Sequence, residues 1–464
     1  MQMLHRTRSL SRLLQSLRQR TNQHSHNFLS TNTQTNHATL ILGGGPIGLS
    51  TAYHLATIDP ARASHITVLE RDPTYSRASA TLSAGGIRQQ FSLCENVQMS
   101  LYGRDFLRGA HELLRVDEEE EVDVQFQERG YLFLASTEGG ARVMRENHGV
   151  QVGQGADVRL LDGDMLKEKF PWLNVEDVVL GSYGESGEGW FDPWILLRGL
   201  KQKCSSMGVN IRKGSPINAV RDNTTGSILS VNAIEQQDGK EVQTTYHVDK
   251  VINAAGAHCA SLMQTLAGST PLKYPIPVEP RKRCIFFFHC AKDQDDGIIV
   301  PDIAPLTICP ISNVYFRSEG NVSEKGEPTG NFLCGVSPSK EDDVAIRDAT
   351  DLEYADHELW DQVIWPALYH RVPAFGEVKL KSSWAGLYEY NTIDQNAIID
   401  FHPEMPNVLM VNGFSGHGLQ QAPAAGRAAA ELVSNGKFQT LNLDIFSFDR
   451  CCGKKPPVFE LGIV

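Results

Sequence analysis

Residues 39–48 read TLILGGGPIG, a short and mainly apolar run that passes directly into three consecutive glycines. Such a run suits a buried strand of a parallel sheet, and residues 49–58 continue as a helix-like stretch. Gly43, Gly45 and Gly48 form a GxGxxG pattern. In this pattern the first glycine allows a tight turn, the second admits a diphosphate, and the third lets the helix pack on the strand. The stretch therefore predicts a strand–turn–helix unit that binds a dinucleotide.

An acidic residue stands at the expected distance from this turn. Residues 66–69 form a second short strand that ends at Glu70, 22 residues after Gly48. A carboxylate at the end of that strand can accept hydrogen bonds from ribose hydroxyls, and it would repel the 2′-phosphate of NADP. The combination favours a dinucleotide site over a glycine-rich turn without a ligand, but it leaves both FAD and NAD open.

Two later segments favour FAD. Residues 251–257, VINAAGA, form an apolar strand that ends in small residues, past which a ligand can lie close to the backbone. Residues 408–411 form another strand, which leads into NGFSGHGLQQ at 412–421 and then into a predicted helix. A glycine-rich helix start can stabilise the negative charge of a reduced flavin, whereas NAD has no anionic ring to stabilise. A tight turn without a ligand is the alternative for this loop taken alone.

The order of these segments resembles the D-amino-acid-oxidase/sarcosine-oxidase (DAO) superfamily of FAD enzymes, over roughly residues 38–445. Within it, the chain resembles a mitochondrial branch that is linked to assembly of respiratory complex I. The segments that carry the resemblance are ERD (70–72), SAGGIRQQFS (83–92), EGWFDPW (188–194), PVEPRKR (277–283), WAG (384–386) and GFSGHGLQQAP (413–423). The resemblance implies an α/β fold with a Rossmann-type FAD-binding domain and an inserted β-rich substrate domain, as in DAO- and glutathione-reductase-like flavoproteins.

The resemblance also implies which residues hold FAD. The expected cofactor-binding residues are Gly43, Gly44, Gly45, Pro46, Ile47, Gly48, Glu70, Arg71, Ser83, Gly85, Gly86, Ala255, Gly256, Gly413, Gly416, His417, Gly418, Leu419 and Gln420. Some relatives tether FAD through a histidine after the second strand or a cysteine shortly before the substrate-domain tyrosine. Residues 74–90 contain no histidine and Leu387 stands where that cysteine is expected, so we expect noncovalent FAD.

Three side chains are candidates for substrate chemistry. Arg88, in the loop after the second strand, could bind a substrate carboxylate or steady the reduced ring. Arg283 is expected where the substrate domain approaches the flavin, and Tyr388 on a strand beside it. A surface or packing role is the alternative for each. Because the flavin itself performs hydride transfer, we expect no catalytic triad and no acid–base pair. We also expect no metal site.

Two discontinuous domains and two terminal segments are predicted. The assignment is a transit peptide at 1–36, an FAD-binding domain at 37–115, 180–275 and 391–445, a substrate domain at 116–179 and 276–390, and a C-terminal tail at 446–464. Residues 92–95, SLCE, match a capping box that would open a long helix, and Asp192–Pro193 predicts the start of another.

The first 36 residues have the composition of an organelle transit peptide. They hold five arginines and no Asp or Glu, and four of their six leucines fall on one helical stripe, at positions 10, 13, 14 and 17. The helix with arginines and leucines favours import into mitochondria over import into chloroplasts, and a basic tail without a targeting role is the alternative. We expect the protein on the matrix side, where it could associate peripherally with the inner membrane.

Composition argues against several other classes of protein. The 464 residues include 43 Lys and Arg against 55 Asp and Glu, a net charge of −12, which argues against a general nucleic-acid binder. Nine cysteines without a CxxC pair argue against a disulfide scaffold and a zinc ribbon.

Three functions remain to be compared. The first is a flavoenzyme that oxidises a small amine, an N-methyl amino acid or a hydroxy acid. The second is an assembly factor for respiratory complex I that keeps FAD for structural stability. The third, an NAD-dependent dehydrogenase, leaves the C-terminal glycine loop without a purpose.

Overall fold

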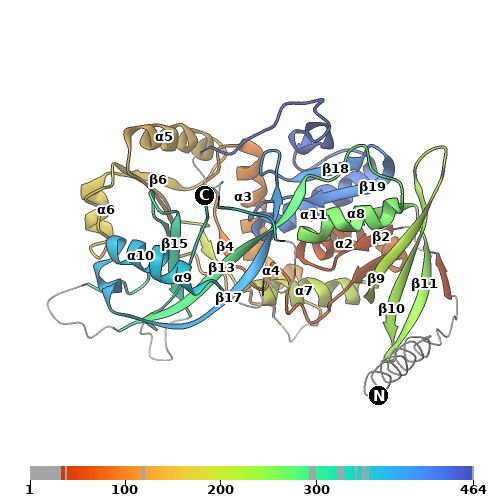
Figure 1. Cartoon of the computed structure of the whole chain (residues 1–464), viewed down its shortest axis with the longest axis horizontal. Helices are drawn as coiled ribbons and strands as arrows, with labels where there is room; N and C mark the ends of the chain where they lie inside the picture. Colours follow the sequence, from red (N-terminus) through yellow and green to blue (C-terminus); the bar gives the residue numbers. More distant parts are fainter. Residues whose placement is uncertain are drawn as a thin grey trace, which may run out of the picture.

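Two large β-sheets dominate the computed structural model of the chain (Figure 1). The described residues are 33–36, 39–117, 121–291, 299–320, 329–339, 342–346, 352 and 355–461. The predicted leader therefore lies outside them up to residue 32. A mixed α/β architecture with a β-rich second part is confirmed.

The first sheet has nine strands, with a parallel group at its centre. Its order is β1 (Thr33–Asn36), β11 (Lys240–His247), β10 (Ile228–Gln237), β9 (Asn210–Arg221), β3 (Ile66–Glu70), β2 (Thr39–Leu42), β12 (Lys250–Asn253), β19 (Met405–Asn412) and β18 (Ile398–His402). The pairings of β3 with β2, β2 with β12, and β12 with β19 are all parallel. The carboxyl ends of these four strands therefore share one edge of the sheet.

The second sheet has eight strands. Its order is β17 (Val378–Asn391), β13 (Val278–Cys290), β16 (Asn331–Val336), β15 (Val314–Glu319), β14 (Leu306–Ile308), β5 (Tyr131–Ala135), β7 (Leu180–Gly184) and β6 (Val158–Leu161). A two-stranded ribbon of β4 (Gly86–Ile87) and β8 (Gly189–Trp190) accompanies the two sheets.

The helices divide between the two parts of the molecule. They are α2 (Pro46–Ile58), α3 (Cys94–Arg108), α4 (Ala110–Leu113), α5 (Glu138–Gly153), α6 (Gly163–Lys169), α7 (Pro193–Ser206), α8 (Cys259–Ala267), α9 (His357–Leu359), the π-helical turn η4 (Trp360–Ile364), α10 (Trp365–Arg371) and α11 (Gly418–Asn435). None of the described helices combines the length and apolarity needed to cross a membrane.

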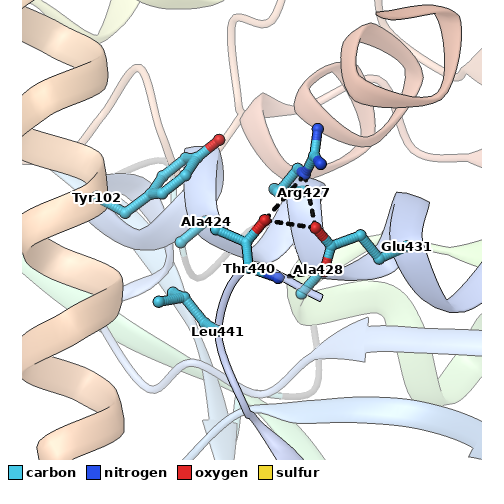
Figure 2. Close-up of a pocket in the computed structure, with 7 residues that line it drawn as sticks. All are labelled: Tyr102, Ala424, Arg427, Ala428, Glu431, Thr440 and Leu441. Carbon is cyan, nitrogen blue, oxygen red and sulfur yellow. Dashed lines mark hydrogen bonds and ion pairs between the residues drawn. The ribbon is translucent and has the colours of Figure 1, made fainter. Parts of the chain in front are cut away.

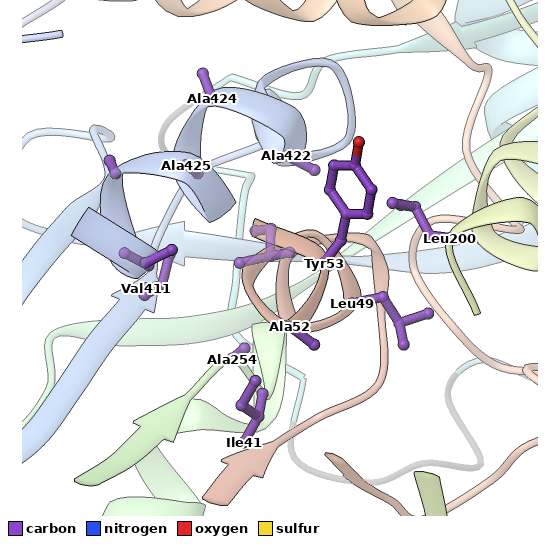
Figure 3. Close-up of a cluster of buried hydrophobic side chains, with 14 of the residues drawn as sticks. Ile41, Leu49, Ala52, Tyr53, Leu200, Ala254, Val411, Ala422, Ala424 and Ala425 are labelled. Atoms are coloured by element: carbon purple, nitrogen blue, oxygen red, sulfur yellow. The ribbon is translucent and has the colours of Figure 1, made fainter. Parts of the chain in front are cut away.

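Strand β2 is buried on both faces, as its sequence predicts. Ile41 belongs to a core with α2, α7 and α11, which Figure 3 shows around Leu49, Leu200 and Ala425. Leu40 and Leu42 belong instead to the core on the other face, where α8 supplies Met263 and Leu266. Because both faces are buried, the sequence of the strand is a continuous apolar run and does not alternate between apolar and polar residues.

The prediction of a capping box at residues 92–95 is wrong, although a long helix does begin there. Helix α3 begins at Cys94, and its N-cap residue, Leu93, makes no side-chain cap. The carboxylate of Glu460 accepts hydrogen bonds instead from the amides of Ser92, at 2.6 Å, and Leu93, at 3.3 Å. Asp192 does cap α7, since its carboxylate accepts from the amides at the helix start.

Three predicted domain boundaries also need correction. Residues 180–184 form β7, which pairs with β5 and β6 of the second sheet and not with the FAD-binding domain. The last residues of the predicted leader, 33–36, pair with β11 at the edge of the first sheet. The predicted tail is packed, because Phe446, Phe448 and Arg450 are buried.

Arg450 explains how the C-terminal segment is held. Its guanidinium pairs with the Asp394 carboxylate at 2.7 Å, and both side chains are almost completely buried. The same Asp394 carboxylate accepts a hydrogen bond from the amide of Val458, at 3.0 Å. The pair therefore ties the chain end to the turn that follows β17.

We predict that Asp394→Asn lowers the free energy of unfolding by about 3–5 kcal/mol, because it leaves a buried guanidinium without its counter-ion. The control is Asp449→Asn, which removes an exposed ion pair with Lys454 and should cost less than about 1 kcal/mol. Urea unfolding of both variants measures the difference, and equal losses would contradict the assignment.

Candidate functional site

The first glycine turn leaves a helix start open. Gly43 has φ +108°, and a Cβ there would lie 2.4 Å from the carbonyl oxygen of Ala254, so only glycine fits. Gly45 is different, because its φ is −71° and a Cβ would meet no atom within 4 Å. Gly45 is also the N-cap of α2, and no side chain caps that helix. The free amides and the positive end of the helix dipole suit a phosphate.

Glu70 stands at the end of β3 beside this turn. Its Oε2 accepts a hydrogen bond from the amide of Gly44, and its Oε1 accepts one from the amide of Asp72, each at 2.7 Å. These two bonds fix the carboxylate, and each oxygen keeps a lone pair for a ribose hydroxyl. Arg71 is exposed, and its charge adds to burial in lowering the pKa of His258.

Two further turns lie at the same edge of the sheet. The amide of Ala255 donates to Oδ1 of Asn253 at 3.2 Å, and Gly256 follows with φ +54°. After β19, Gly413 and Gly416 have φ values of +79° and +99°. Helix α11 then begins with no side-chain cap. Because β12 lies between β2 and β19, all three turns are neighbours.

The residues present fit a flavin dinucleotide. The open space at Gly45 and the uncapped starts of α2 and α11 can hold a diphosphate and an anionic ring, and Glu70 can hold a ribose. Among the described residues, no group of three or more His, Cys, Asp or Glu side chains is placed to hold a metal ion.

Comparison with known proteins identifies the family. The profile of the FAD-dependent oxidoreductase family (DAO) matches residues 39–432. The chain belongs to this family. It is therefore an FAD-dependent oxidoreductase of the DAO type, and the resemblance read from the sequence motifs is confirmed.

Relatives extend the comparison over most of the chain. The FAD-dependent oxidoreductase domain-containing protein 1 of Xenopus laevis is 44% identical, over 92% of this chain and 84% of its own length. The mitochondrial sarcosine dehydrogenase of Homo sapiens is 24% identical, over 86% of this chain and 40% of its own length. Among solved structures, L-proline dehydrogenase from P. horikoshii has a TM-score of 0.72 at 23% identity, over 90% of this chain and 98% of its own.

Arg88 is a buried cation without a carboxylate partner in the described part of the chain. It is 4% exposed and follows β4. Its guanidinium carbon lies 4.8 Å from the ring centre of Phe91, 5.5 Å from that of Tyr131 and 5.1 Å from that of Phe133. Its Nη1 reaches the hydroxyl of Tyr131 only at 3.5 Å, and its Nε has no hydrogen-bond partner. The side chain therefore offers donors that no protein anion uses.

His417 orients this guanidinium from the glycine turn. Its Nε2 lies 3.0 Å from Nη2 of Arg88. Burial and the Arg88 charge lower the pKa of His417 to about 3, so the ring is neutral and accepts the hydrogen bond. The side chain of Gln420, in the first turn of α11, accepts from the backbone amide of Arg88 at 2.8 Å. Two predicted cofactor-binding residues thus also hold Arg88.

Glu188 holds the same loop from the other side. The backbone amide of Gln89 donates to its Oε1 at 2.6 Å, and the side chain of Gln90 donates to its Oε2 at 2.7 Å. Burial raises the pKa of Glu188 to about 7, against the lowering effects of these hydrogen bonds and of Arg88. Glu188 is therefore a positioning residue for the Arg88 loop, which the sequence predictions did not include although its motif EGWFDPW was a visible signal.

Arg283 is not free to take part in chemistry. It forms a bidentate ion pair with Asp343, at 2.7 and 2.8 Å, and both side chains are about nine-tenths buried. The flat guanidinium lies 4.5 Å from the ring centre of Tyr388. The prediction of a catalytic Arg283 is therefore corrected to a positioning role, because its charge is already neutralised.

Tyr388 does lie beside the glycine turn of α11. A Cβ at Gly416 would lie only 2.4 Å from its ring. Its proximity also adds to the raised pKa values of Tyr131 and Tyr315, for which burial is the main cause. Tyr131, which no sequence signal marked because it sits in an apolar strand, thus joins Tyr388 and Arg88 in one cluster.

The predicted residues of the 83–86 loop are held by the segment around β8 and by Arg317 of the second sheet. The amide of Gly85 donates to Oγ of Ser83 at 3.3 Å, and a Cβ at Gly85 would lie 2.4 Å from the carbonyl oxygen of Phe191. Gly86 pairs with Trp190. Arg317 donates twice to the carbonyl of Ala84, at 3.0 and 2.8 Å. The loop is therefore fixed against the part of the molecule that contains Arg88.

A small pocket beside α3 and α11 has a structural explanation. In Figure 2, Glu431 accepts hydrogen bonds from Arg427 at 2.7 Å and from the hydroxyl of Thr440 at 2.5 Å. The amides of Gln439 and Thr440 donate to its other oxygen. All of its acceptors are used in holding the segment after α11, so this pocket is not a candidate site.

We predict that Gly45→Val weakens FAD binding at least about tenfold without unfolding the protein. The new side chain has room within the protein and no backbone strain, but it enters the space next to the α2 amides that a diphosphate needs. Flavin absorbance per protein, together with circular dichroism, measures the two effects.

The control is Gly149→Val, at another glycine whose Cβ would meet nothing within 4 Å, on the distant helix α5. It should keep its flavin. Full flavin content in the Gly45→Val protein would contradict the placement of the diphosphate.

Proposed function

We propose that this chain oxidises a small carboxylate-bearing amine, such as an N-methyl amino acid, or a hydroxy acid of similar size. The observation that carries the proposal is the unpaired Arg88. A buried guanidinium without an anion costs several kcal/mol, and a substrate carboxylate would remove that cost through charge-assisted, bidentate hydrogen bonds.

The surroundings of Arg88 support a small substrate. The rings of Phe91, Tyr131 and Phe133 lie around the guanidinium and exclude water from it. Exclusion of water strengthens the attraction between Arg88 and a carboxylate. The hydroxyls of Tyr131 and Tyr388 are available to a substrate amine or hydroxyl, since no described residue hydrogen-bonds Tyr388 through its side chain and Tyr131 makes only the long contact with Arg88.

The division of labour in the reaction follows from these residues. FAD, when bound, supplies a hydride acceptor at N5. Arg88 holds the substrate carboxylate, and His417 keeps the guanidinium in place. His417 does not take a proton near neutral pH, because its pKa is about 3. The proton on the amine or hydroxyl of the substrate therefore passes to solvent or to another group before the C–H bond is broken.

A mitochondrial role belongs to the same proposal. Its support is the arginine-rich leader without acidic residues and the resemblance to the branch linked to complex I assembly. We propose the matrix side of the inner membrane as the location and complex I intermediates as partners. An assembly factor that keeps FAD only for stability is the second candidate, but it leaves the unpaired Arg88 without a purpose.

We predict that Arg88→Gln removes discrimination in favour of a carboxylate. With a panel of α-amino and N-methyl amino acids, each paired with its carboxamide, the unaltered protein should reduce its flavin at least about 100-fold faster with the acid. In the variant the ratio should fall below about tenfold. Anaerobic stopped-flow absorbance gives both rates.

Arg108→Gln is the matched control, since it removes an exposed arginine paired with Glu128. This control should leave the ratio of the flavin reduction rates with acid and carboxamide unchanged. An unchanged acid-to-amide ratio in Arg88→Gln, at full flavin content, would rule out Arg88 as the carboxylate site.

A second comparison separates the enzyme from the assembly factor. Reduction of the flavin by one specific compound supports the enzyme. A flavin inert to the whole panel, together with stable capture of complex I intermediates from mitochondria, supports the assembly factor.

A further inference from the structure

Glu389 is a carboxyl group in the cofactor site that no sequence pattern marked. It lies on β17, directly after Tyr388. The amide of Gly413 donates to its Oε2 at 3.1 Å, and the amide of Phe414 donates to the same carboxyl. Glu389 thus occupies two amides of the glycine turn before α11, next to the uncapped helix start that is expected to receive negative charge from the cofactor.

The same carboxyl faces two of the three glycine turns. A Cβ on Gly418, the first residue of α11, would lie 3.0 Å from Oε1. A Cβ on Gly256, in the turn after β12, would lie 4.0 Å from Oε2. The carboxyl therefore sits between the turns that follow β12 and β19, and glycine at both positions leaves room for it.

No described cation neutralises Glu389. From α8, the titratable neighbour is Cys259, and Glu389 adds to burial in raising the pKa of its thiol. The pKa of His258, in the turn before α8, is lowered by burial and by Arg71. From the glycine turn, the neighbour is His417, which is neutral. Burial raises the pKa of Glu389 to about 7, against the two amide hydrogen bonds.

Arg281 and Arg283 of the neighbouring strand lie on the other side of the sheet. Lys282, opposite Leu387, lies on the same face as Glu389, but no ion pair joins these two described residues. Side chains alternate along β17, so Tyr388 and Tyr390 point away from Glu389. Arg283 lies over Tyr388 and Arg281 over Tyr390, at 4.5 and 4.8 Å. The residue of β13 opposite Glu389 is Pro280, which carries no charge.

We propose that Glu389 is a proton-linked cofactor-binding residue, whose carboxyl takes up one proton from solvent when FAD binds. The diphosphate brings negative charge to the edge of the sheet where Glu389 already lies, and two unneutralised anions repel strongly away from water. A protonated carboxyl keeps its carbonyl oxygen on the Gly413 amide and gains an O–H donor for the cofactor. It also leaves the positive end of α11 uncancelled for a reduced flavin.

FAD affinity must then depend on pH. A group that is protonated in the complex and ionised in the free protein weakens binding by about tenfold for each pH unit above its free pKa. Because that pKa is about 7, the carboxyl is already half ionised at pH 7, and FAD binding should weaken about 50-fold between about pH 7 and about pH 9. The inference depends on FAD binding and not on the proposed substrate.

The test compares FAD release from the holoprotein of the unaltered chain, Glu389→Gln and Glu377→Gln. Glu377 is an exposed residue immediately before the same strand, so it controls for the chemical change. Flavin fluorescence after dilution gives the dissociation constant across the pH range. The FAD dissociation constant of Glu389→Gln should vary less than about threefold across this pH range. That of Glu377→Gln should change with pH as it does in the unaltered protein.

Infrared spectroscopy of the holoprotein provides a second readout that needs no removal of FAD. At about pH 8, the unaltered protein should show the carbonyl band of a protonated carboxylic acid, and Glu389→Gln should lack that contribution. Calorimetry in two buffers of different ionisation enthalpy should show uptake of about one proton on FAD binding, and about none in Glu389→Gln.

The same pH dependence in the unaltered protein and Glu389→Gln would overturn the inference, as would the absence of a carboxylic-acid band that depends on Glu389. A bound flavin that no substrate reduces would count against the proposed function alone. The two failures are therefore distinguishable.

Discussion

The site depends on one arrangement, in which three parallel strands end side by side and each is followed by a glycine turn. Strands β2, β12 and β19 are adjacent, and the helices that follow β2 and β19 start without side-chain caps. Free backbone amides and helix dipoles give this edge a positive potential that no lysine or arginine is needed to create. Such a potential suits a dinucleotide, because the backbone can approach the phosphates without a side chain between them.

The second sheet matters because it brings side chains to that edge. Arg88 lies on a loop that Gln420 fixes to α11 and that Glu188 fixes beside β8. Tyr388 and Glu389 come from β17, at the edge of the second sheet, and contact the turn before α11. The backbone of the first sheet therefore supplies the cofactor site, and side chains carried to it by the second sheet determine what reacts there.

The parts of this site that could be predicted from the sequence are those with a local pattern. The strand before Gly43, the helix after it and Glu70 all lie within one unit of 32 residues, whose chemistry requires glycines and an acid at set distances. The turn before α11 shows a comparable pattern. The four strands involved were predicted within a few residues of their observed bounds.

The parts that could not be predicted depend on partners far away in the chain. Arg283 appeared to be a free cation until Asp343, 60 residues later, was found beside it. The amides of Ser92 and Leu93, just before α3, donate to Glu460, which follows Ser92 by 368 residues, and the local pattern at 92–95 gives no sign of that partner. Charge pairing between distant segments leaves no periodicity or spacing in a sequence, and only the folded chain shows which charges are already neutralised.

Arg88 and Glu389 show why this distinction matters for function. Arg88 is buried and Glu389 is partly buried, and neither has an oppositely charged partner among the described residues. Arg450 and Asp394 show that the same chain pairs its buried charges where only stability is needed. An unpaired buried charge lowers stability, so its presence beside the turn before α11 is best explained by a ligand that completes it. Arg88 lacks an anion and Glu389 can gain a proton, and under our two proposals an anionic substrate would complete the first and an anionic cofactor the second.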